Sequence, residues 1–212
     1  MNSFKNKDGR IIMLMMIKGI QNNKTYLGDV DGLIGDGDHG MNMSKGFTLF
    51  QEQLGDREII FSDGLTELSS IPFNKIGDSM GPIYGTIFSE MGDCADGSDN
   101  IDLNKFVDML QAGLYGLYDI VEARPGDKTL VDTLHPALSS LNESRSCCDD
   151  FKSALENMKS AADRGMKSTV DMVARFGRSS RLGERSKGVQ DAGATACCII
   201  LNAMADGIIA LL

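Results

Sequence analysis

Apolar residues recur along this chain at intervals near 3.6 positions, the spacing that places them on one face of an α-helix. The pattern predicts eight helices, over residues 8–26, 42–54, 62–75, 82–92, 101–122, 129–143, 149–173 and 191–211. The clearest stripe lies in 101–122, where Asp99 or Asn100 stands at the position of a helix cap. Strand patterns are nearly absent, so the sequence predicts an all-α fold.

Four glycine-bearing segments follow alternate predicted helices. They read GDGDHG (35–40), GDSMGP (77–82), RPGDKT (124–129) and FGRSSRLGERSKGVQDAG (176–193). In an up-and-down helix bundle, alternate connections emerge at the same end of the bundle. We therefore expect these four segments to gather at one end and to build a single site there.

The overall composition is that of an ordinary globular protein. The chain has 212 residues, of which 42% are apolar and 24% charged, and its formal net charge of -9 disfavours a nucleic-acid partner. The apolar run at 11–17 is too short to cross a bilayer, and no small-residue cleavage site follows it. The sequence therefore predicts one domain over 1–212, with neither a nucleic-acid nor a membrane partner.

The cysteines indicate a reducing compartment. No C-x-x-C pair occurs and the number of cysteines is odd, so neither a zinc site nor a disulfide framework is expected. We interpret these five thiols as core residues of a cytoplasmic protein, at Cys94, Cys147, Cys148, Cys197 and Cys198.

The densest negative charge lies in DVDGLIGDGDHGMN, residues 29–42, which contains Asp29, Asp31, Asp36 and Asp38. Like charges this close repel unless a cation offsets them. The glycines of the segment disfavour a regular helix, so Asp36 and Asp38 point to the same side and Asp31 approaches them from the preceding helix end. Oxygen ligands without cysteine select Mg²⁺ or Ca²⁺, and the glycine and ligand positions of an EF-hand do not match. A solvated acidic turn is the alternative interpretation.

The other segments supply groups that suit phosphate. Backbone N–H groups from Met41 to Ser44, at the start of a helix beside the carboxylates, favour a metal-bridged polyphosphate and hence a nucleotide. The second segment is either a phosphate-binding helix start or a packing feature, and in the third Arg124 and Lys128 either offset phosphate charge or are solvated. The fourth segment holds the only strong positive cluster, with Arg175, Arg178, Arg181, Arg185 and Lys187.

The four segments together resemble the successive signatures of one family, the nucleotide-binding (L) subunit of bacterial dihydroxyacetone kinases, called DhaL. The matching stretches are IGDGDHGMNMSKGF, GPIYGT, PGDKTLVDTLHPA and GRSSRLGERSKGVQDAGAT, and the resemblance covers essentially the whole chain. It implies a closed barrel of eight antiparallel amphipathic helices, with ADP or ATP held at one end by two Mg²⁺ ions.

The resemblance also implies roles for individual residues. The metal ligands would be Asp31, Asp36 and Asp38. The nucleotide phosphates would contact His39, Gly40, Met41, Asn42, Ser79 and Met80, while Leu130 would line the adenine pocket. Arg178 and the turn of Asp191, Ala192 and Gly193 would complete the site. During transfer, Arg178 and His39 would stabilise the transferring phosphoryl group.

The same resemblance implies partners. A separate K-type subunit would hold the hydroxyketone covalently on a histidine. The donor would be either exchangeable ATP or a fixed ADP that an M-type phosphocarrier of the phosphotransferase system rephosphorylates. A nucleotide-loaded regulator that binds a transcription factor without catalysis is the alternative, and a metal-dependent phosphatase ranks third because strands are lacking.

One stretch departs from the family pattern. The second segment of the family usually reads G-G-x-S-G-P, whereas this chain has Asp78, Ser79 and Met80 between its two glycines. The hydroxyl expected at position 80 is missing and an acid has entered at position 78. We therefore hypothesise that the acceptor is another short ketose, such as a tetrulose.

Overall fold

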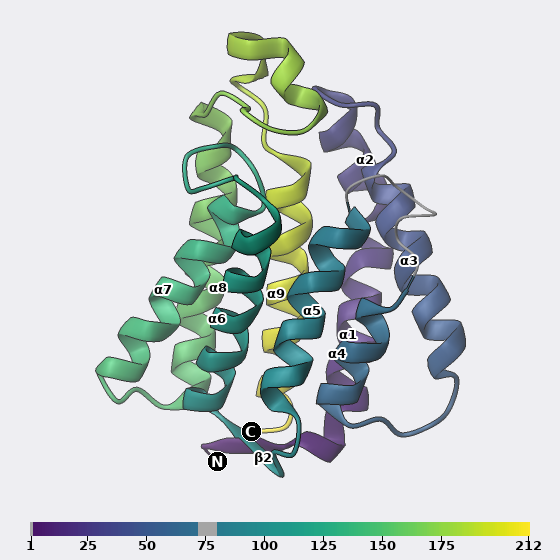
Figure 1. Cartoon of the computed structure of the whole chain (residues 1–212), viewed down its shortest axis with the longest axis vertical. Coiled ribbons are helices and arrows are strands. Elements are labelled where there is room, and N and C mark those ends of the chain that lie inside the picture. Colours follow the sequence, from purple (N-terminus) through teal and green to yellow (C-terminus); the bar gives the residue numbers. More distant parts are fainter. Residues whose placement is uncertain (1, 72–79) are drawn as a thin grey trace.

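The computed structural model describes residues 2–71 and 80–212, which form a mainly helical protein (Figure 1). The α-helices are α1 (Gly9–Asn22), α2 (Lys24–Gly32), α3 (His39–Leu54), α4 (Phe61–Ser69), α5 (Met80–Ala95), α6 (Leu103–Ile120), α7 (Val131–Ser146), α8 (Phe151–Ser168) and α9 (Ala192–Ile209). The described residues also contain 3-10 segments at η1 (Asn6–Asp8), η3 (Thr169–Asp171) and η4 (Arg178–Ser186). Strands β1 (Ser3–Lys5) and β2 (Asn100–Asp102) pair antiparallel. The predicted helical fold is confirmed.

The helices pack mainly on their neighbours along the chain. Contacts join α4 to α5, α5 to α6, α6 to α7, α7 to α8 and α8 to α9, and α9 returns to pack on α1. The buried apolar side chains form one continuous core between these helices. Strand β1 and the C-terminus lie at one end of the molecule, and η4 lies at the opposite end (Figure 1).

Helix α9 is the most apolar of the described helices. Among the described residues it is the one helix long and apolar enough to cross a membrane, and 67% of that stretch is buried inside the protein. Helices α1, α7 and α8 pack against it. Its apolar character is therefore that of a core helix.

The first predicted helix, 8–26, is wrong in its extent. The helix is interrupted at Asn23, whose side chain donates a hydrogen bond to the Gly19 carbonyl at 2.8 Å. Asparagine competes with the helix for backbone groups in this way. A second helix, α2, then continues to Gly32 and carries Asp31 in its last turn.

Other helix boundaries differ for local reasons. Helix α6 begins at Leu103 and not at 101, because residues 100–102 pair with β1 and the Asp102 carboxylate caps the helix by accepting from the Lys105 N–H at 2.8 Å. Helix α8 ends at Ser168, five residues before its predicted end, where the chain tightens into η3. Helix α4 ends at Ser69, and the predicted continuation over 72–75 lies outside the described residues.

The first turn of α3 lies against α2 without room for a side chain. An ideal Cβ on Gly40 would lie 2.0 Å from the Lys24 carbonyl oxygen and 2.7 Å from the Gly28 nitrogen. We expect Gly40→Ala to lower the free energy of unfolding by about 2 kcal/mol, because backbone atoms of two helices would have to separate. Urea unfolding measures this loss.

The matched control for that variant is Gly32→Ala. At Gly32 the nearest atom to an added Cβ is 3.8 Å away, so the free energy of unfolding should change by less than about 0.5 kcal/mol. Equal stability of the two variants would show that α3 does not depend on this close approach.

Candidate functional site

A cavity of about 370 Å³ opens at the end of the molecule where η4 lies. Its lining residues come from the loop between α2 and α3, the start of α5, the turn before α7, the segment around η4 and the start of α9. The expected convergence of the glycine-bearing segments is therefore confirmed for their described parts. Gly77, Asp78 and Ser79 lie outside the described residues.

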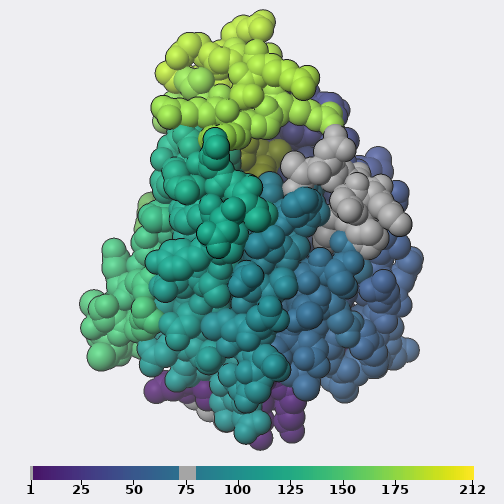
Figure 2. All heavy atoms as spheres, viewed as in Figure 1, coloured from purple at the N-terminus to yellow at the C-terminus, as the bar shows by residue number. Residues whose placement is uncertain are grey.

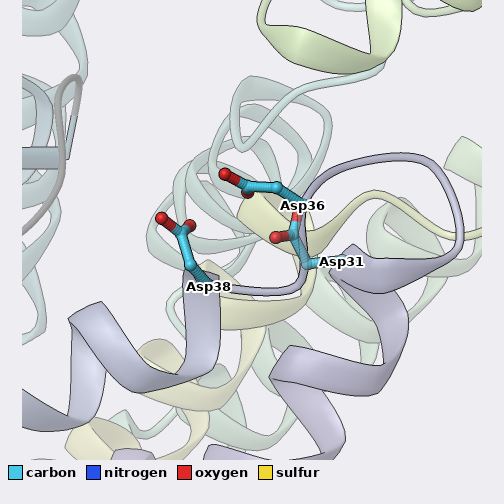
Figure 3. Close-up of side chains that lie close together, drawn as sticks. All are labelled: Asp31, Asp36 and Asp38. Carbon is cyan, nitrogen blue, oxygen red and sulfur yellow. The ribbon is translucent and has the colours of Figure 1, made fainter.

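Three carboxylates converge at one side of this cavity (Figure 3). Asp31 comes from the last turn of α2, Asp36 from the following loop and Asp38 from the N-cap of α3, and one oxygen of each lies within 4.8 Å of the others. Gly35 makes this possible, because a Cβ there would stand 2.3 Å from Asp31 Oδ1. Three oxygen ligands at this spacing fit a hard divalent cation such as Mg²⁺.

The helix that follows presents backbone N–H groups beside these carboxylates. Helix α3 begins at His39, three residues before its predicted start, so the Asn42 N–H already donates to the Asp38 carbonyl at 2.9 Å. The N–H groups without an intrahelical acceptor are therefore those of Gly40 and Met41, not those from Met41 to Ser44. The Met41 side chain is 57% exposed and does not line the cavity, so Gly40 and Met41 can serve a bound anion only through their backbone.

His39 faces the cavity with a side chain that has unused hydrogen-bonding capacity. Its Nε2 atom is buried and has no hydrogen-bond partner among the described residues. Burial lowers the pKa of His39, and the nearby Asp31 carboxylate offsets part of that shift. The ring is therefore neutral at physiological pH and can exchange a hydrogen bond with a bound group.

A second helix N-terminus reaches the cavity at the start of α9. Asp191 caps this helix by accepting a hydrogen bond from the Ala194 N–H at 2.7 Å, which leaves the N–H groups of Ala192 and Gly193 without an intrahelical acceptor. All three residues line the cavity. Two helix N-termini therefore border the same space, an arrangement that favours a multiply charged anion.

The carboxyl of Asp191 has a raised affinity for its proton. Burial raises its pKa from 3.8 to about 6, against the lowering effect of the Ala194 hydrogen bond and the Lys128 ammonium. The folded state therefore binds this proton more tightly than the unfolded state does. The resulting stabilisation is complete below pH 3.8 and is lost as the pH rises through about 6.

Asp191→Asn should remove this pH dependence, because the amide stays neutral and still caps a helix. We expect the variant to melt roughly 6–12 °C above the unsubstituted protein near neutral pH, with the difference vanishing toward pH 3.8. Thermal melts across that pH range measure the effect. A constant difference at all pH values would assign it to something other than the proton on Asp191.

Part of the cavity lining is apolar. Leu130 is buried and belongs to this part, together with Ile83, Tyr84, Val121 and Phe176. The sequence analysis missed the last four residues. The only signal for Ile83 and Tyr84 is their position one helical turn after Met80, which also lines the cavity. An apolar wall in the same cavity as two helix N-termini suits a ligand with a flat ring at one end and phosphates at the other.

The positive cluster of the fourth segment contributes one side chain to the cavity lining. Arg178, the first residue of η4, lines the cavity and forms an ion pair with Asp36. Arg181 and Arg185 are not part of the lining, and Lys187 pairs with Glu184 at 3.1 Å. The segment, expected to be a loop, contains two 3-10 turns that meet at Gly183, where φ is 53°.

The two cations of the third segment differ in their surroundings. Lys128 lines the cavity but is only 1% exposed, and its ammonium contacts backbone carbonyls. Arg124 is exposed, and its guanidinium lies 4.3 Å from the centre of the Tyr118 ring and donates to the carbonyls of Val121 and Ala123. The interpretation as a solvated charge is therefore wrong for Lys128, whereas Arg124 is exposed as that interpretation expects.

This helical protein therefore has a pocket that suits a metal-bound phosphorylated ligand. The pocket combines convergent carboxylates, two helix N-termini, an arginine and an apolar wall. The family comparison agrees with this class. The model of the DAK2 domain matches residues 33–206, and the chain belongs to the DAK2 domain family.

Related proteins of known name cover most of the chain. It is 37% identical over 186 residues to the PEP-dependent dihydroxyacetone kinase, ADP-binding subunit DhaL of Escherichia coli, spanning 85% of this chain and 86% of that one. It is 33% identical to the PTS-dependent dihydroxyacetone kinase, ADP-binding subunit DhaL of Lactococcus lactis, over 82% and 83% of the two chains. The L-erythrulose kinase of Pectobacterium atrosepticum is 27% identical over 86% of this chain, which spans 31% of that longer protein.

Solved structures share the fold. The dihydroxyacetone kinase from C. freundii in complex with AMP-PNP and Mg²⁺ superposes with a TM-score of 0.66 at 20% identity. The superposition covers 94% of this chain and 33% of the larger kinase. At this level of identity the likeness concerns the arrangement of helices alone.

Proposed function

We propose that this protein is the ADP- or ATP-binding subunit of a dihydroxyacetone kinase-type phosphotransferase, active together with a partner subunit. The observation that carries the proposal is the cluster of Asp31, Asp36 and Asp38 at the N-terminus of α3. The cluster lies in a cavity that is also lined by Arg178 and by apolar side chains. The names of the relatives support the same activity.

Asp31, Asp36 and Asp38 would hold Mg²⁺, and we propose two ions there. Bound Mg²⁺ would neutralise the charge of the nucleotide phosphates. The phosphates would lie against the backbone of Gly40 and Met41, the side chains of His39 and Asn42, and the second segment at Ser79 and Met80. The start of α9, at Asp191, Ala192 and Gly193, would border them on the other side. The nucleobase would pack on Leu130.

Phosphoryl transfer depends on positioning and on stabilisation of negative charge, and two side chains of this chain suit that task. Arg178 already neutralises one carboxylate oxygen of Asp36, and a guanidinium can exchange that partner for a phosphate oxygen. The neutral His39 can donate a hydrogen bond to the transferring group. We assign the catalytic roles to Arg178 and His39.

The names of the relatives, which are ADP-binding subunits of dihydroxyacetone kinases, support dihydroxyacetone as the acceptor and the presence of partner subunits. We propose further that a K-type subunit presents dihydroxyacetone or a related short ketose, and that an M-type phosphocarrier is the source of phosphate in the phosphotransferase-dependent mode. The erythrulose kinase among the relatives supports a tetrulose as the related ketose. The named relatives do not support the alternative of a non-catalytic regulator.

The same proposal includes the architecture and the location. We propose that 1–212 is a single domain whose helices close into the eight-helix barrel, supported by one continuous core and by the packing of α9 on α1. The five cysteines are free thiols, which supports a cytoplasmic protein. Their interpretation as core residues is correct for Cys197 and Cys198 and wrong for Cys147 and Cys148, which are exposed where α7 ends.

Reconstitution tests the proposal directly. ADP should bind the purified protein in calorimetry with Mg²⁺ and not without it, and the K-type subunit should then permit phosphoryl transfer to dihydroxyacetone or erythrulose. Retention of ADP through gel filtration would identify the phosphocarrier-dependent mode, and its rapid loss would identify ATP as an exchangeable substrate. Normal ADP binding without transfer to any ketose would refute the kinase and favour the regulator.

A further inference from the structure

Lys128 occupies an unusual place beside the cavity. It lies in the turn between α6 and α7, is 1% exposed, and has a φ of 61°. Residues with side chains seldom adopt this left-handed backbone conformation, and lysines are seldom buried. Both features have an energetic cost, so the position of this ammonium needs a compensating contact.

Backbone carbonyls from one segment provide that contact. The ammonium donates to the carbonyl oxygens of Thr169 at 2.7 Å, Ser186 at 2.8 Å and Val189 at 2.5 Å, and the Met172 oxygen lies 3.3 Å away. An ammonium has three N–H donors, so these oxygens use its whole capacity. All four belong to residues 169–189, the segment that joins α8 to α9.

The turn that carries Lys128 is itself firmly held. The Asp132 carboxylate accepts from the N–H groups of Gly126 at 2.5 Å and Thr129 at 2.8 Å. Asp127 adds a second attachment to the same segment, because its carbonyl accepts from the Arg175 N–H at 3.2 Å. The turn before α7 therefore acts as a fixed anchor for residues 169–189.

The anchored segment forms one wall of the cavity. Phe176, Gly177, Arg178 and Ser179 line the cavity, and Arg178 reaches Asp36 on the far side. In the space-filling view, this segment covers one end of the molecule above the turn that anchors it (Figure 2). Residues 169–189 are rich in small and polar side chains, which make few apolar contacts. Without the anchor, little would therefore hold this segment in place over the cavity.

We propose that Lys128 is a positioning residue, whose ammonium holds residues 169–189 over the cavity so that Arg178 stands beside the carboxylate cluster. The importance of this placement for nucleotide binding rests on the proposed function, whereas the placement itself does not. Direct binding of phosphate by Lys128 is disfavoured, since its donors are already used by carbonyls.

Limited proteolysis of the whole protein tests the placement without any ligand. The segment contains four arginines at which trypsin cuts, at Arg175, Arg178, Arg181 and Arg185. In Lys128→Met, cleavage at these sites should become about ten-fold faster or more, while circular dichroism shows the helices intact. The matched control is Lys167→Met, which removes an exposed lysine paired with Asp163 and should leave these cleavage rates unchanged.

A glycine variant separates the ammonium from the backbone conformation. Lys128→Gly relieves the left-handed backbone but removes the side chain, so it should be cleaved as fast as Lys128→Met. Cleavage of the glycine variant at the rate of the unsubstituted protein would overturn the proposal. If Lys128→Met does not fold, Lys128→Gln, which keeps two N–H donors, takes its place. Loss of the helical signal in both would also overturn it, because Lys128 would then support the whole helical body.

A double-mutant cycle tests the link to Arg178. Lys128→Met and Arg178→Ala should each weaken Mg²⁺-dependent ADP binding about ten-fold, and the double variant should be at most about two-fold weaker than Arg178→Ala. Independent effects would multiply to about 100-fold and would contradict a role exerted through Arg178. If the unsubstituted protein binds no ADP, the proposed function fails, and the proteolysis still decides the placement.

Discussion

Asp36→Asn and Asp38→Asn are each expected to weaken Mg²⁺-dependent ADP binding by at least about 100-fold. Each change keeps the shape of the side chain but removes one of the three converging carboxylates. Loss of a group that only orients a metal ligand costs 10- to 100-fold in metal affinity, so loss of a ligand itself should cost at least about the upper value. Calorimetric titration with ADP at a fixed Mg²⁺ concentration measures the change.

The chain provides a matched control for these variants in Asp29→Asn. Asp29 lies on α2 like Asp31, but it is exposed and lies outside both the carboxylate cluster and the cavity lining. Its substitution removes the same charge and should change the affinity for ADP less than about two-fold, since exposed charges are screened. Equal losses of ADP affinity in all three variants would indicate a general effect of charge. They would contradict the assignment of Asp36 and Asp38 as metal ligands.

Arg178→Ala should lower the rate of phosphoryl transfer on the order of 100- to 1000-fold in the reconstituted enzyme, because an aligned charged donor to the transferring group is lost. The same change should strengthen binding of Mg²⁺ alone, because the guanidinium no longer competes for Asp36. Transfer rates with the K-type subunit and Mg²⁺ titrations without nucleotide measure the two effects.

These opposite effects distinguish Arg178 from the other arginines of its segment. Arg181→Ala serves as the control, because Arg181 is exposed and does not line the cavity. It should leave both the transfer rate and the Mg²⁺ affinity unchanged. A transfer rate that survives Arg178→Ala would exclude this residue from the catalytic machinery.

The acidic half of the site could be predicted because its geometry is local. Asp31, Asp36 and Asp38 stand within eight positions of one another, and the glycines between them disfavour a helix and permit a tight turn. The gathering of distant segments also follows from the regular alternation of helices and connections. The predicted start of α3 was wrong by three residues. The helix begins at His39, and this changes which backbone N–H groups border the site.

The third and fourth segments show where such reasoning failed. Lys128 in PGDKT has the neighbours of an ordinary solvated turn residue, and its burial depends on carbonyls more than forty positions away. Among the five cations of the fourth segment, position alone does not indicate which one reaches Asp36. The apolar wall formed by Val121 and Phe176 likewise has no local pattern that distinguishes it from any other core contact.

The helical class, the carboxylate cluster and the gathering of the segments at one end could be predicted from the order of residues, because helical periodicity and short-range charge repulsion act between near neighbours. The pairing of Arg178 with Asp36, the apolar wall and the burial of Lys128 became visible only in the packed fold. These features depend on contacts between distant segments, whose distances and solvent exclusion arise only when the helices pack together.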